Sequence, residues 1–276
     1  MREPSHLRRI LITWIVASVI LTPIIILVAA PGLPPGDSSN QASGQVVDNT
    51  VLLGILTPIA TLIVVYFAYS LRAFRHRDGE PDEGVAIRGN SRVQLTWIVA
   101  TSAVVLVAAV YGTVRLFSDG GAGGGQGSNP VAKLTGHPLQ VQVIAQEWAF
   151  TYRFPSYGGV ETPHLELPVG KDVEFHATSL DVIHSFWVHD LGVKVDANPG
   201  VDNIAYIKPT ETGSFDLRCA ELCGLFHGHM FDTMQVVSDA RFASWIHAQE
   251  RLFAPAKRNL PRYNIHYYPK PERRAG

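Results

Sequence analysis

Three stretches of this chain run for more than 20 residues without a charge, and they constrain the fold more than any other feature of the sequence. They are residues 10–30, 51–71 and 93–114. At about 1.5 Å per helical residue, each is long enough to cross a hydrocarbon layer of roughly 30 Å. An ordinary buried helix would carry one polar face, and these stretches carry none. We therefore predict transmembrane helices, at least for the second and third, because Pro23 and Pro58 are tolerated in such spans.

Arginine residues flank these stretches unevenly. The arginines lie before the first stretch and between the second and third, at Arg2, Arg8, Arg9, Arg72, Arg75, Arg77, Arg88 and Arg92. Residues 31–50 contain neither lysine nor arginine. By the positive-inside rule the arginine-bearing segments are cytoplasmic, so everything after residue 114 is exported. We expect a multi-pass protein of the plasma membrane whose C-terminal part lies on the extracytoplasmic side.

The first stretch has two interpretations. Its basic start and the small residues Val28, Ala29 and Ala30 would suit a cleaved signal peptide. However, 21 apolar residues exceed a usual signal-peptide core, and Pro31 would directly follow the cut. A retained helix is favoured, and both interpretations stay open.

The exported part has the texture of a β domain. Short runs rich in Val, Ile, Phe and Tyr alternate with Pro and Gly, which predicts seven strands in a Greek-key sandwich or barrel. The predicted strands are residues 139–154, 164–168, 172–178, 182–189, 203–208, 214–218 and 231–237, followed by a helix over 239–251 that Asp239 would cap. The predicted organisation is an N-terminal span (1–30), a helix hairpin (51–117), a Gly-rich linker (118–130), the β domain (131–248) and a basic tail (249–276).

Charge is partitioned within the exported part. Residues 131–248 contain 7 Lys and Arg against 14 Asp and Glu, whereas residues 249–276 contain 7 basic and 2 acidic residues. The acidic domain could steer a basic partner towards itself, or it could simply be a well-solvated surface. The basic tail could lie along other subunits or along anionic lipid headgroups.

The chain's only two cysteines lie in a segment that also carries imidazole and thioether groups. Cys219 and Cys223 are followed by His227 and Met230, and the imidazole of His184 lies 35 residues before Cys219. Thiolate mixed with imidazole is a donor set that selects copper. Two thiolates, two imidazoles and a thioether exceed the needs of one blue-copper ion, so two coppers that share both sulfurs fit the set better.

Two other interpretations of the cysteines are weaker. Paired thiols in an exported domain often form a disulfide, but the neighbouring imidazoles and Met230 favour a metal. Zinc accepts two thiolates and two imidazoles, but it does not account for Met230 and cannot carry electrons. Gly224 would permit the tight loop that brings Cys223 and His227 back to Cys219.

These residues resemble the signature of subunit II of the haem–copper cytochrome c oxidases. That signature reads Cys-x-Glu-x-Cys-Gly-x-x-His-x-x-Met after an upstream Asp-Val-x-His-Ser, and here it covers residues 219–230 and 181–185. Residues 191–200 also resemble the family's segment between the two motifs. The resemblance covers the last two apolar stretches and the whole exported domain, and the cysteine motif is highly specific.

The resemblance implies a mixed membrane protein in which N-terminal transmembrane helices precede an all-β, cupredoxin-like Greek-key domain with a binuclear CuA centre. The implied copper ligands are His184, Cys219, Glu221, Cys223, His227 and Met230. The cysteines would bridge two coppers per chain, the histidines would be terminal ligands, and the methionine would be a weak ligand. Glu221 would coordinate through its carbonyl, and its carboxylate would face a magnesium site at subunit I unless it is an ordinary surface acid. His189 and His229 are expected to be non-ligands, because a strand-like turn would point His229 away from His227.

Other family features map onto Trp148 and three acids. Trp148 matches an aromatic segment through which electrons enter from cytochrome c, although it could simply be a core aromatic. Asp181, Asp190 and Asp196 are candidates for docking a lysine-rich cytochrome c. The family commonly has glutamate near the start of its last helix, at the mouth of a proton path, where this chain has Gln94. Glutamine cannot ionise, so we expect proton entry here to use another group or another path.

The expected function is electron transfer within a respiratory terminal oxidase. Electrons would pass from cytochrome c to CuA and then to haem in subunit I, where oxygen reduction is coupled to proton translocation. The expected partners are subunits I and III, cytochrome c and membrane lipid, and no nucleic acid. The alternatives are an exported copper carrier or assembly protein and the related quinol oxidase subunit, which lacks the copper ligands present here.

Overall fold

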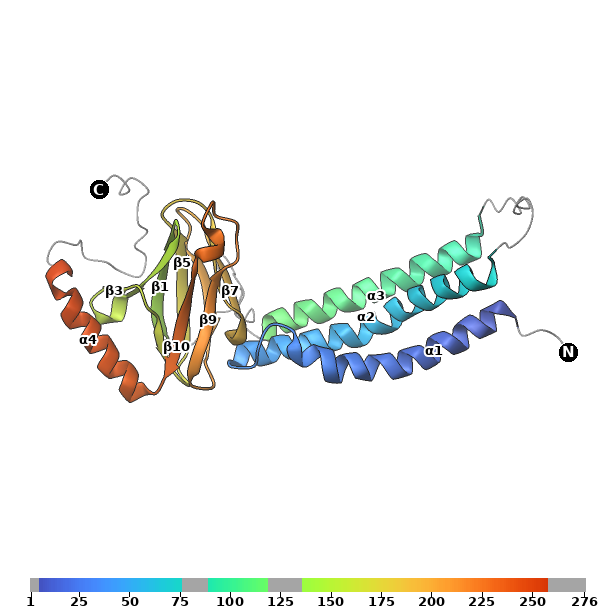
Figure 1. The fold of residues 1–276 in the computed structure, drawn as a ribbon, viewed down its shortest axis with the longest axis horizontal. Helices are drawn as coiled ribbons and strands as arrows, with labels where there is room; N and C mark the ends of the chain where they lie inside the picture. The colour runs from blue at the N-terminus through green and yellow to red at the C-terminus, as the bar shows by residue number, and fades with distance from the viewer. Residues whose placement is uncertain (1–4, 76–88, 119–135, 258–276) are drawn as a thin grey trace. The chain divides into compact units, whose positions relative to one another are not determined.

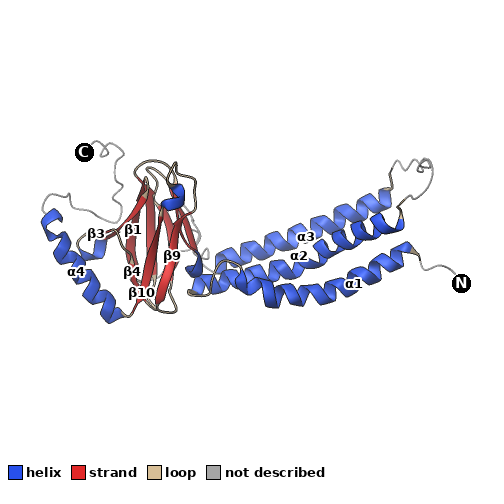
Figure 2. Ribbon diagram, in the orientation of Figure 1, coloured by secondary structure: helices blue, strands red, loops and turns tan. Residues whose placement is uncertain are grey.

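The computed structural model describes residues 5–75, 89–118 and 136–257, and these form two compact units. The helical unit contains the N-terminal residues up to Leu33 together with Asp48–Val114, and the β unit contains Pro34–Val47 together with the chain from Arg115 onwards. Figures 1 and 2 show long helices in the first unit and mostly strands in the second. The predicted linker beyond Ser118 and the predicted tail beyond Lys257 lie outside the described residues.

Three apolar helices make up the membrane part of the chain. They are α1 (His6–Ile24), which continues through a π-helical turn (Ile25–Ala29) and a 3-10 turn (Ala30–Gly32), α2 (Asn40–Ala73) and α3 (Ser91–Ser118). All three are long and apolar enough to cross a membrane, so the expected helical part of the fold is confirmed, with three helices in the described residues. Whether the first is retained or cleaved stays a prediction.

Polar side chains set the ends and the contacts of these helices. The hydroxyl of Ser5 accepts from the Arg8 N–H at 3.4 Å, which caps α1. Between helices, the indole N–H of Trp14 on α1 donates to the Pro58 carbonyl on α2 at 2.8 Å, and the Tyr111 hydroxyl on α3 donates to Asp48 on α2 at 2.8 Å. The remaining helix surface is apolar and exposed, as expected of surfaces that face lipid or other subunits.

The β unit is a sandwich of two five-stranded sheets (Figure 1). One sheet has the order β3-β2-β1-β5-β8, with bounds Val160–Thr162, Ala149–Phe154, Leu139–Gln146, Val173–Ser179 and Asn203–Ile207. The other has the order β4-β10-β9-β6-β7, with bounds Glu166–Pro168, Phe231–Val237, Gly213–Cys219, His184–Val188 and Val193–Ala197. Among the strands of the described residues, only the β1–β5 and β4–β10 pairs are parallel. This confirms the predicted β domain and selects the sandwich over the barrel.

Large aromatic side chains fill the space between the sheets. Phe186 of β6 is fully buried and packs near the rings of Phe150, Tyr152 and Phe175, with ring centroids 5.0–6.3 Å apart. Alternating exposure along β9 and β7 gives each strand one core face and one outer face. Since Phe186 pairs with Cys219 across β6 and β9, the cysteine segment begins directly above this core.

The strand prediction was wrong in three places. Residues 139–154 form two strands, because the chain turns at Glu147 and Trp148 and β2 pairs back onto β1. Strands β3 and β7 were missed, although the exposure of β7 alternates strictly.

The C-terminal helix α4 (Asp239–Lys257) begins as predicted, but the side chain that accepts from its first turn is Ser238, which binds the Arg241 N–H at 3.4 Å. Phe242 and Ile246 face the core, as expected.

The segment Pro34–Val47 is hydrogen-bonded to the sandwich. The Ser39 hydroxyl donates to the Leu191 carbonyl at 2.7 Å, the Asn40 N–H donates to the Lys208 carbonyl at 3.1 Å, and Gln45 donates to the Gly192 carbonyl at 2.6 Å. The side chain of Ala42 is fully buried. The first turns of α2 therefore belong structurally to the β unit, which the sequence did not reveal.

A buried histidine in the first sheet makes the stability of the β unit pH-dependent. His176 on β5 bonds Asp202 through Nδ1 and Glu174 through Nε2, both at 2.7 Å. Burial lowers the pKa of His176, but the two carboxylates outweigh burial and raise the pKa to about 9. Since the folded pKa exceeds the unfolded value of about 6.5, the stabilisation is complete below pH 6.5 and is lost as the pH rises through about 9.

We therefore expect His176→Gln to lower stability at pH 6 by about 3 kcal/mol, a difference that shrinks to a small fraction by pH 10. Thermal unfolding of the full chain in detergent, followed by near-ultraviolet circular dichroism, measures it. The control is His164→Gln, since His164 is exposed and lies 3.8 Å from its partner Asp232. A stability difference that stays constant from pH 6 to pH 10 would contradict the assignment.

Candidate metal centre

The predicted donor residues come from three separate places in the β unit. His184 is the first residue of β6, Cys219 is the last residue of β9, and Met230 directly precedes β10. Backbone hydrogen bonds hold these ends together, because Cys219 N–H donates to the Met230 carbonyl at 2.9 Å and Ala220 N–H donates to the Ser185 carbonyl at 3.0 Å. The loop after β9 then returns Cys223 and His227 to the same point. It turns at Gly224, whose φ of +106° is accessible to glycine but strained for other residues.

The donor atoms of all the predicted ligands converge. The sulfurs of Cys219 and Cys223 lie 3.7 Å apart. Nδ1 of His184 lies 3.9 Å from the Cys219 sulfur, and Nδ1 of His227 lies 3.4 Å from the Cys223 sulfur. The Met230 sulfur lies 3.8 Å from that of Cys223. His184 and the two cysteines form a buried group whose donor atoms lie within 4.8 Å of one another.

The carbonyl of Glu221 completes the set. It lies 3.3 Å from the Cys219 sulfur, whereas the Glu221 carboxylate side chain is exposed. Sulfur and imidazole donors at these separations fit soft transition metals and do not suit magnesium or calcium, which prefer oxygen. The arrangement therefore fits the copper pair that the donor types predict.

The two thiols are electrostatically unequal. Burial raises the pKa of Cys219, whereas hydrogen bonds between its sulfur and the backbone at Ser185 and Glu221 lower it. Burial and the adjacent Cys219 sulfur raise the pKa of Cys223. The metal-free pair thus holds one proton readily, and a metal must displace it, because the thiolate is the form that ligates.

Trp148 lies at the turn between β1 and β2, against the cysteine loop. Its indole N–H donates to the Cys223 carbonyl at 2.9 Å, and its ring meets Phe226 edge to face at 4.8 Å. A side chain on Gly224 would come within 3.4 Å of the indole nitrogen, so the glycine also permits this close approach. The half-buried indole therefore contacts the cysteine loop directly, so Trp148 does not serve only to fill the core.

The remaining predicted residues have different surroundings. The strand-like turn expected at His229 is wrong, because residues His227–His229 form a 3-10 turn in which the exposed His229 ring faces Phe226. His189 pairs with Asp190 at 3.3 Å, away from the converging donors. Of the three proposed docking acids, Asp196 is exposed and Asp190 is partly exposed, but the Asp181 side chain is only 11% exposed.

Exposed apolar side chains on the ligand-bearing loops were missed in the sequence. Leu222, Leu225 and Phe226 on the cysteine loop are 78%, 83% and 47% exposed. Val182 and Ile183, which directly precede His184, are 40% and 48% exposed. Exposed apolar groups that gather at one place mark protein contacts. The sequence does signal these side chains, because each loop contains a run of apolar residues that is too short to form a strand.

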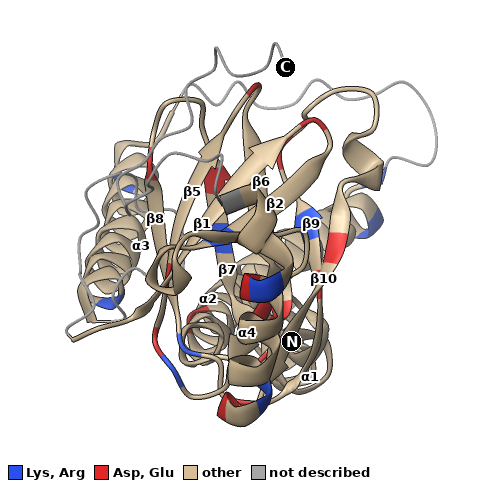
Figure 3. Cartoon of the chain, turned by 90° about the vertical axis from the view of Figure 1, so that its left-hand side faces the viewer, with Lys and Arg blue, Asp and Glu red and all other residues tan. Residues whose placement is uncertain are grey.

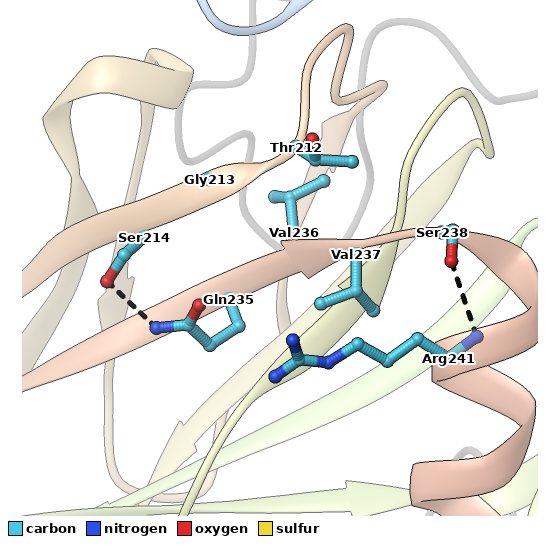
Figure 4. A pocket seen from close by; sticks show the side chains of 8 residues that line it. All are labelled: Thr212, Gly213, Ser214, Gln235, Val236, Val237, Ser238 and Arg241. Carbon is cyan, nitrogen blue, oxygen red and sulfur yellow. Dashed lines mark hydrogen bonds between the residues drawn. The ribbon is translucent and has the colours of Figure 1, made fainter.

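A surface cavity lies elsewhere on the β unit. It has a volume of about 450 Å³ and lies where β9, β10 and α4 meet, as Figure 4 shows. Its polar lining includes Ser214, Gln235 and Arg241. Gln235 donates to Ser214 at 2.8 Å, so part of the polar lining is already paired. None of the predicted donor residues lines this cavity. Figure 3 colours the acidic and basic residues in the described part of the chain.

Comparison with known proteins identifies the family. The family model described as cytochrome c oxidase subunit II, periplasmic domain, matches residues 161–237, which contain every converging donor. The cytochrome c oxidase subunit 2 of Thermostichus vulcanus is 27% identical over 279 residues, covering 85% of this chain and 84% of that protein. The corresponding protein of Alkalihalophilus pseudofirmus is 30% identical over 215 residues, covering 76% of this chain and 60% of that protein.

A probable cytochrome c oxidase subunit 2 from Streptomyces coelicolor is 48% identical over a shorter stretch of 80 residues, covering 29% of this chain and 25% of that protein. Three apolar helices and a β sandwich that matches a periplasmic-domain family describe a membrane protein with an extracytoplasmic domain. The converging thiol, imidazole and thioether groups lie inside the matched residues. Together these findings show that the chain belongs to the family of cytochrome c oxidase subunit II, as one subunit of an oxidase.

Proposed function

We propose that this chain accepts electrons from cytochrome c at a binuclear copper centre and passes them to haem in subunit I, where oxygen reduction drives proton translocation. The observation that carries the proposal is the convergence of two cysteine sulfurs 3.7 Å apart with two imidazoles, a thioether and a carbonyl. Cys219, Cys223, His184 and His227 would hold two copper ions, which would supply a one-electron carrier. The Cys₂His₂Met set exceeds what a single copper or zinc ion requires.

The protein's own contribution is to hold the donors still. His184, Cys219 and Met230 lie at the ends of strands that are hydrogen-bonded to one another, and the first of these side chains is fully buried. Donors fixed by a sheet move little when the charge of the site changes, and fast electron transfer requires small rearrangement. The buried surroundings of the cysteines also keep bulk water away from the sulfurs.

The exposed groups around the site support the proposed partners. Leu222, Leu225 and Phe226 offer an apolar surface next to the donors, as expected for contacts with subunit I or cytochrome c. The exposed Glu221 carboxylate is free to bind magnesium with ligands from subunit I, and subunit III and lipid would cover the helices. The segment Pro34–Val47 belongs to the β unit, which supports the inference that the loop after α1 and the metal domain lie on one side of the plasma membrane.

The test is copper loading of the full chain in detergent. We expect two copper ions per chain, a purple colour and a delocalised mixed-valence EPR signal. The control is a chain whose two cysteines are alkylated before loading, and this chain should bind neither copper ion. A blue chain with a single copper would overturn the binuclear assignment, and a colourless zinc-selective chain would overturn electron transfer.

Trp148 is proposed as the point of electron entry. In Trp148→Phe the ring remains but the hydrogen bond to the Cys223 carbonyl is lost, at a cost of about 1 kcal/mol. We expect an unchanged EPR signal and a lower rate of copper reduction by cytochrome c in stopped-flow mixing. Trp187→Phe is the matched control, because Trp187 is also half-buried but its ring lies tilted against that of His189 instead. Equal rates in the two variants would remove the entry role.

Gln94 tests the proton path. It lies in the first turn of α3, where its N–H donates to the Asn90 carbonyl at 2.9 Å. An ionisable group can relay a proton where an amide can only orient water. If position 94 takes part in proton entry, Gln94→Glu should alter turnover and pumping of the assembled oxidase, measured by oxygen consumption and pH change in vesicles. No change in either would make the position irrelevant.

A further inference from the structure

The carboxylate of Asp181 contacts several groups beside the proposed metal centre. It lies in the loop between β5 and β6, three residues before His184. Its Oδ1 accepts from the Val182 N–H at 2.8 Å and lies 2.7 Å from Nε2 of His184. Its Oδ2 accepts from the Glu147 N–H at 2.6 Å. The Ser179 hydroxyl also donates to Oδ1, at 3.2 Å.

These contacts fix the protonation of the His184 ring. A carboxylate that already accepts from two backbone N–H groups acts as an acceptor, so Nε2 of His184 must carry the hydrogen. Nδ1 then presents its lone pair towards the Cys219 sulfur, 3.9 Å away. The ring is fully buried, so no water can replace the carboxylate.

The same carboxylate holds the turn that carries Trp148. Glu147 N–H binds Asp181 on one side, and the indole N–H of Trp148 binds the Cys223 carbonyl on the other. The turn is therefore tied to the His184 side of the site by Asp181 and to the cysteine loop by the indole. Movement of Asp181 would displace both His184 and the Trp148 turn.

The second imidazole lacks this support. His227 lies on a short 3-10 turn and is partly exposed, with Nδ1 3.4 Å from the Cys223 sulfur. In the described part of the chain, its ring is not hydrogen-bonded to any carboxylate. One imidazole of the pair is thus fixed by a buried partner, and the other is free to adjust.

We propose that Asp181 is a positioning residue that holds His184 in the Nε2–H tautomer and couples it to the Trp148 turn. The inference rests on the proposed copper function and replaces the earlier expectation that Asp181 docks cytochrome c. The Asp181 side chain is only 11% exposed and already accepts from groups of this chain, so it offers little to a partner's lysine. Removal of such a supporting carboxylate typically weakens metal binding about 10–100-fold.

The test compares Asp181→Asn with Asp196→Asn in the full chain in detergent. Asparagine keeps the shape, but its NH₂ group would face either the Glu147 N–H or the His184 Nε2–H. Asp196→Asn removes the same charge from an exposed position and is the control. We expect the copper dissociation constant of Asp181→Asn, measured against a chromogenic copper(I) chelator, to rise about 10–100-fold, with an altered EPR hyperfine pattern. Binding by Asp196→Asn should match the wild type.

A second measurement does not depend on copper or on the variant's folding. Nitrogen-15 NMR of the metal-free wild-type chain, labelled at histidine, reports the tautomer of His184. An Nδ1-protonated ring, or equal copper affinity in the two variants, overturns the role of Asp181 and leaves the proposed function standing. A wild-type chain that binds no copper removes the proposed function, and the tautomer still decides the position of the proton.

Discussion

Cys223→Ser is expected to abolish the proposed copper pair and, with it, turnover of the assembled oxidase with cytochrome c. The Cys223 sulfur lies within 3.8 Å of three other donors, those of Cys219, His227 and Met230, so its loss removes the centre of the site. A serine hydroxyl is a harder and weaker donor than thiolate and cannot bridge two soft ions. Copper content, the EPR signal and oxygen consumption should all fall below detection.

Met230→Leu is the matched control for this prediction. Leucine fills a similar volume in the buried position but supplies no donor. Both bridging sulfurs remain, so we expect two coppers per chain with a shifted EPR spectrum and a slower turnover. If Cys223→Ser retained two coppers per chain, the cysteines would not bridge the pair, and the proposed function would lose its support.

Gly192→Ala is expected to cause a large loss of stability outside the metal centre. Gly192 has a φ of +62°, and a Cβ there would come within 2.8 Å of the Cα and 2.9 Å of the nitrogen of Ala42. The left-handed backbone costs an alanine about 1–2 kcal/mol. Overpacking against the buried backbone of the Pro34–Val47 segment adds about 1–3 kcal/mol, for a total of about 2–5 kcal/mol. Thermal unfolding of the full chain, followed by near-ultraviolet circular dichroism, measures the loss.

Gly200→Ala separates the two causes. Gly200 has a φ of +75°, but no atom lies within 4 Å of a Cβ built there, so this variant pays only the backbone cost of about 1–2 kcal/mol. The difference between the two variants is the contact with Ala42. Equal losses would mean that the Pro34–Val47 segment does not press on the sandwich in solution.

The sequence predicted the features that depend on local chemistry or on length. The apolar helices could be found because a stretch of more than 20 uncharged residues forms a helix whose whole surface must be covered by a membrane or by another subunit. The donors could be found because Cys219, Cys223 and His227 combine rare residue types within a short span. Their convergence with His184 was expected from a family pattern, and the structure places all of these donor atoms together.

The features that were missed depend on backbone geometry. The turn at Glu147 lies between two apolar runs without the Gly or Asn that usually marks a hairpin, so residues 139–154 read as one strand. The hydrogen bonds that hold Pro34–Val47 run mainly to backbone carbonyl groups. Every residue has such a group, so these bonds cannot be predicted from residue type. Asp181 looked like a surface acid because its four partners are set by the fold around it.

The attachment of Pro34–Val47 to the sandwich also affects biogenesis. After α1 the ribosome makes this segment, then the rest of α2 and α3, and only afterwards the strands to which the segment binds. The sandwich can therefore complete its edge only when the early segment has already been translocated to the same side. Two spans separate the segment from the strands, so a chain in which only one of α2 and α3 inserts would leave the segment and the strands on opposite sides, and completion of the sandwich therefore reports that both helices have inserted.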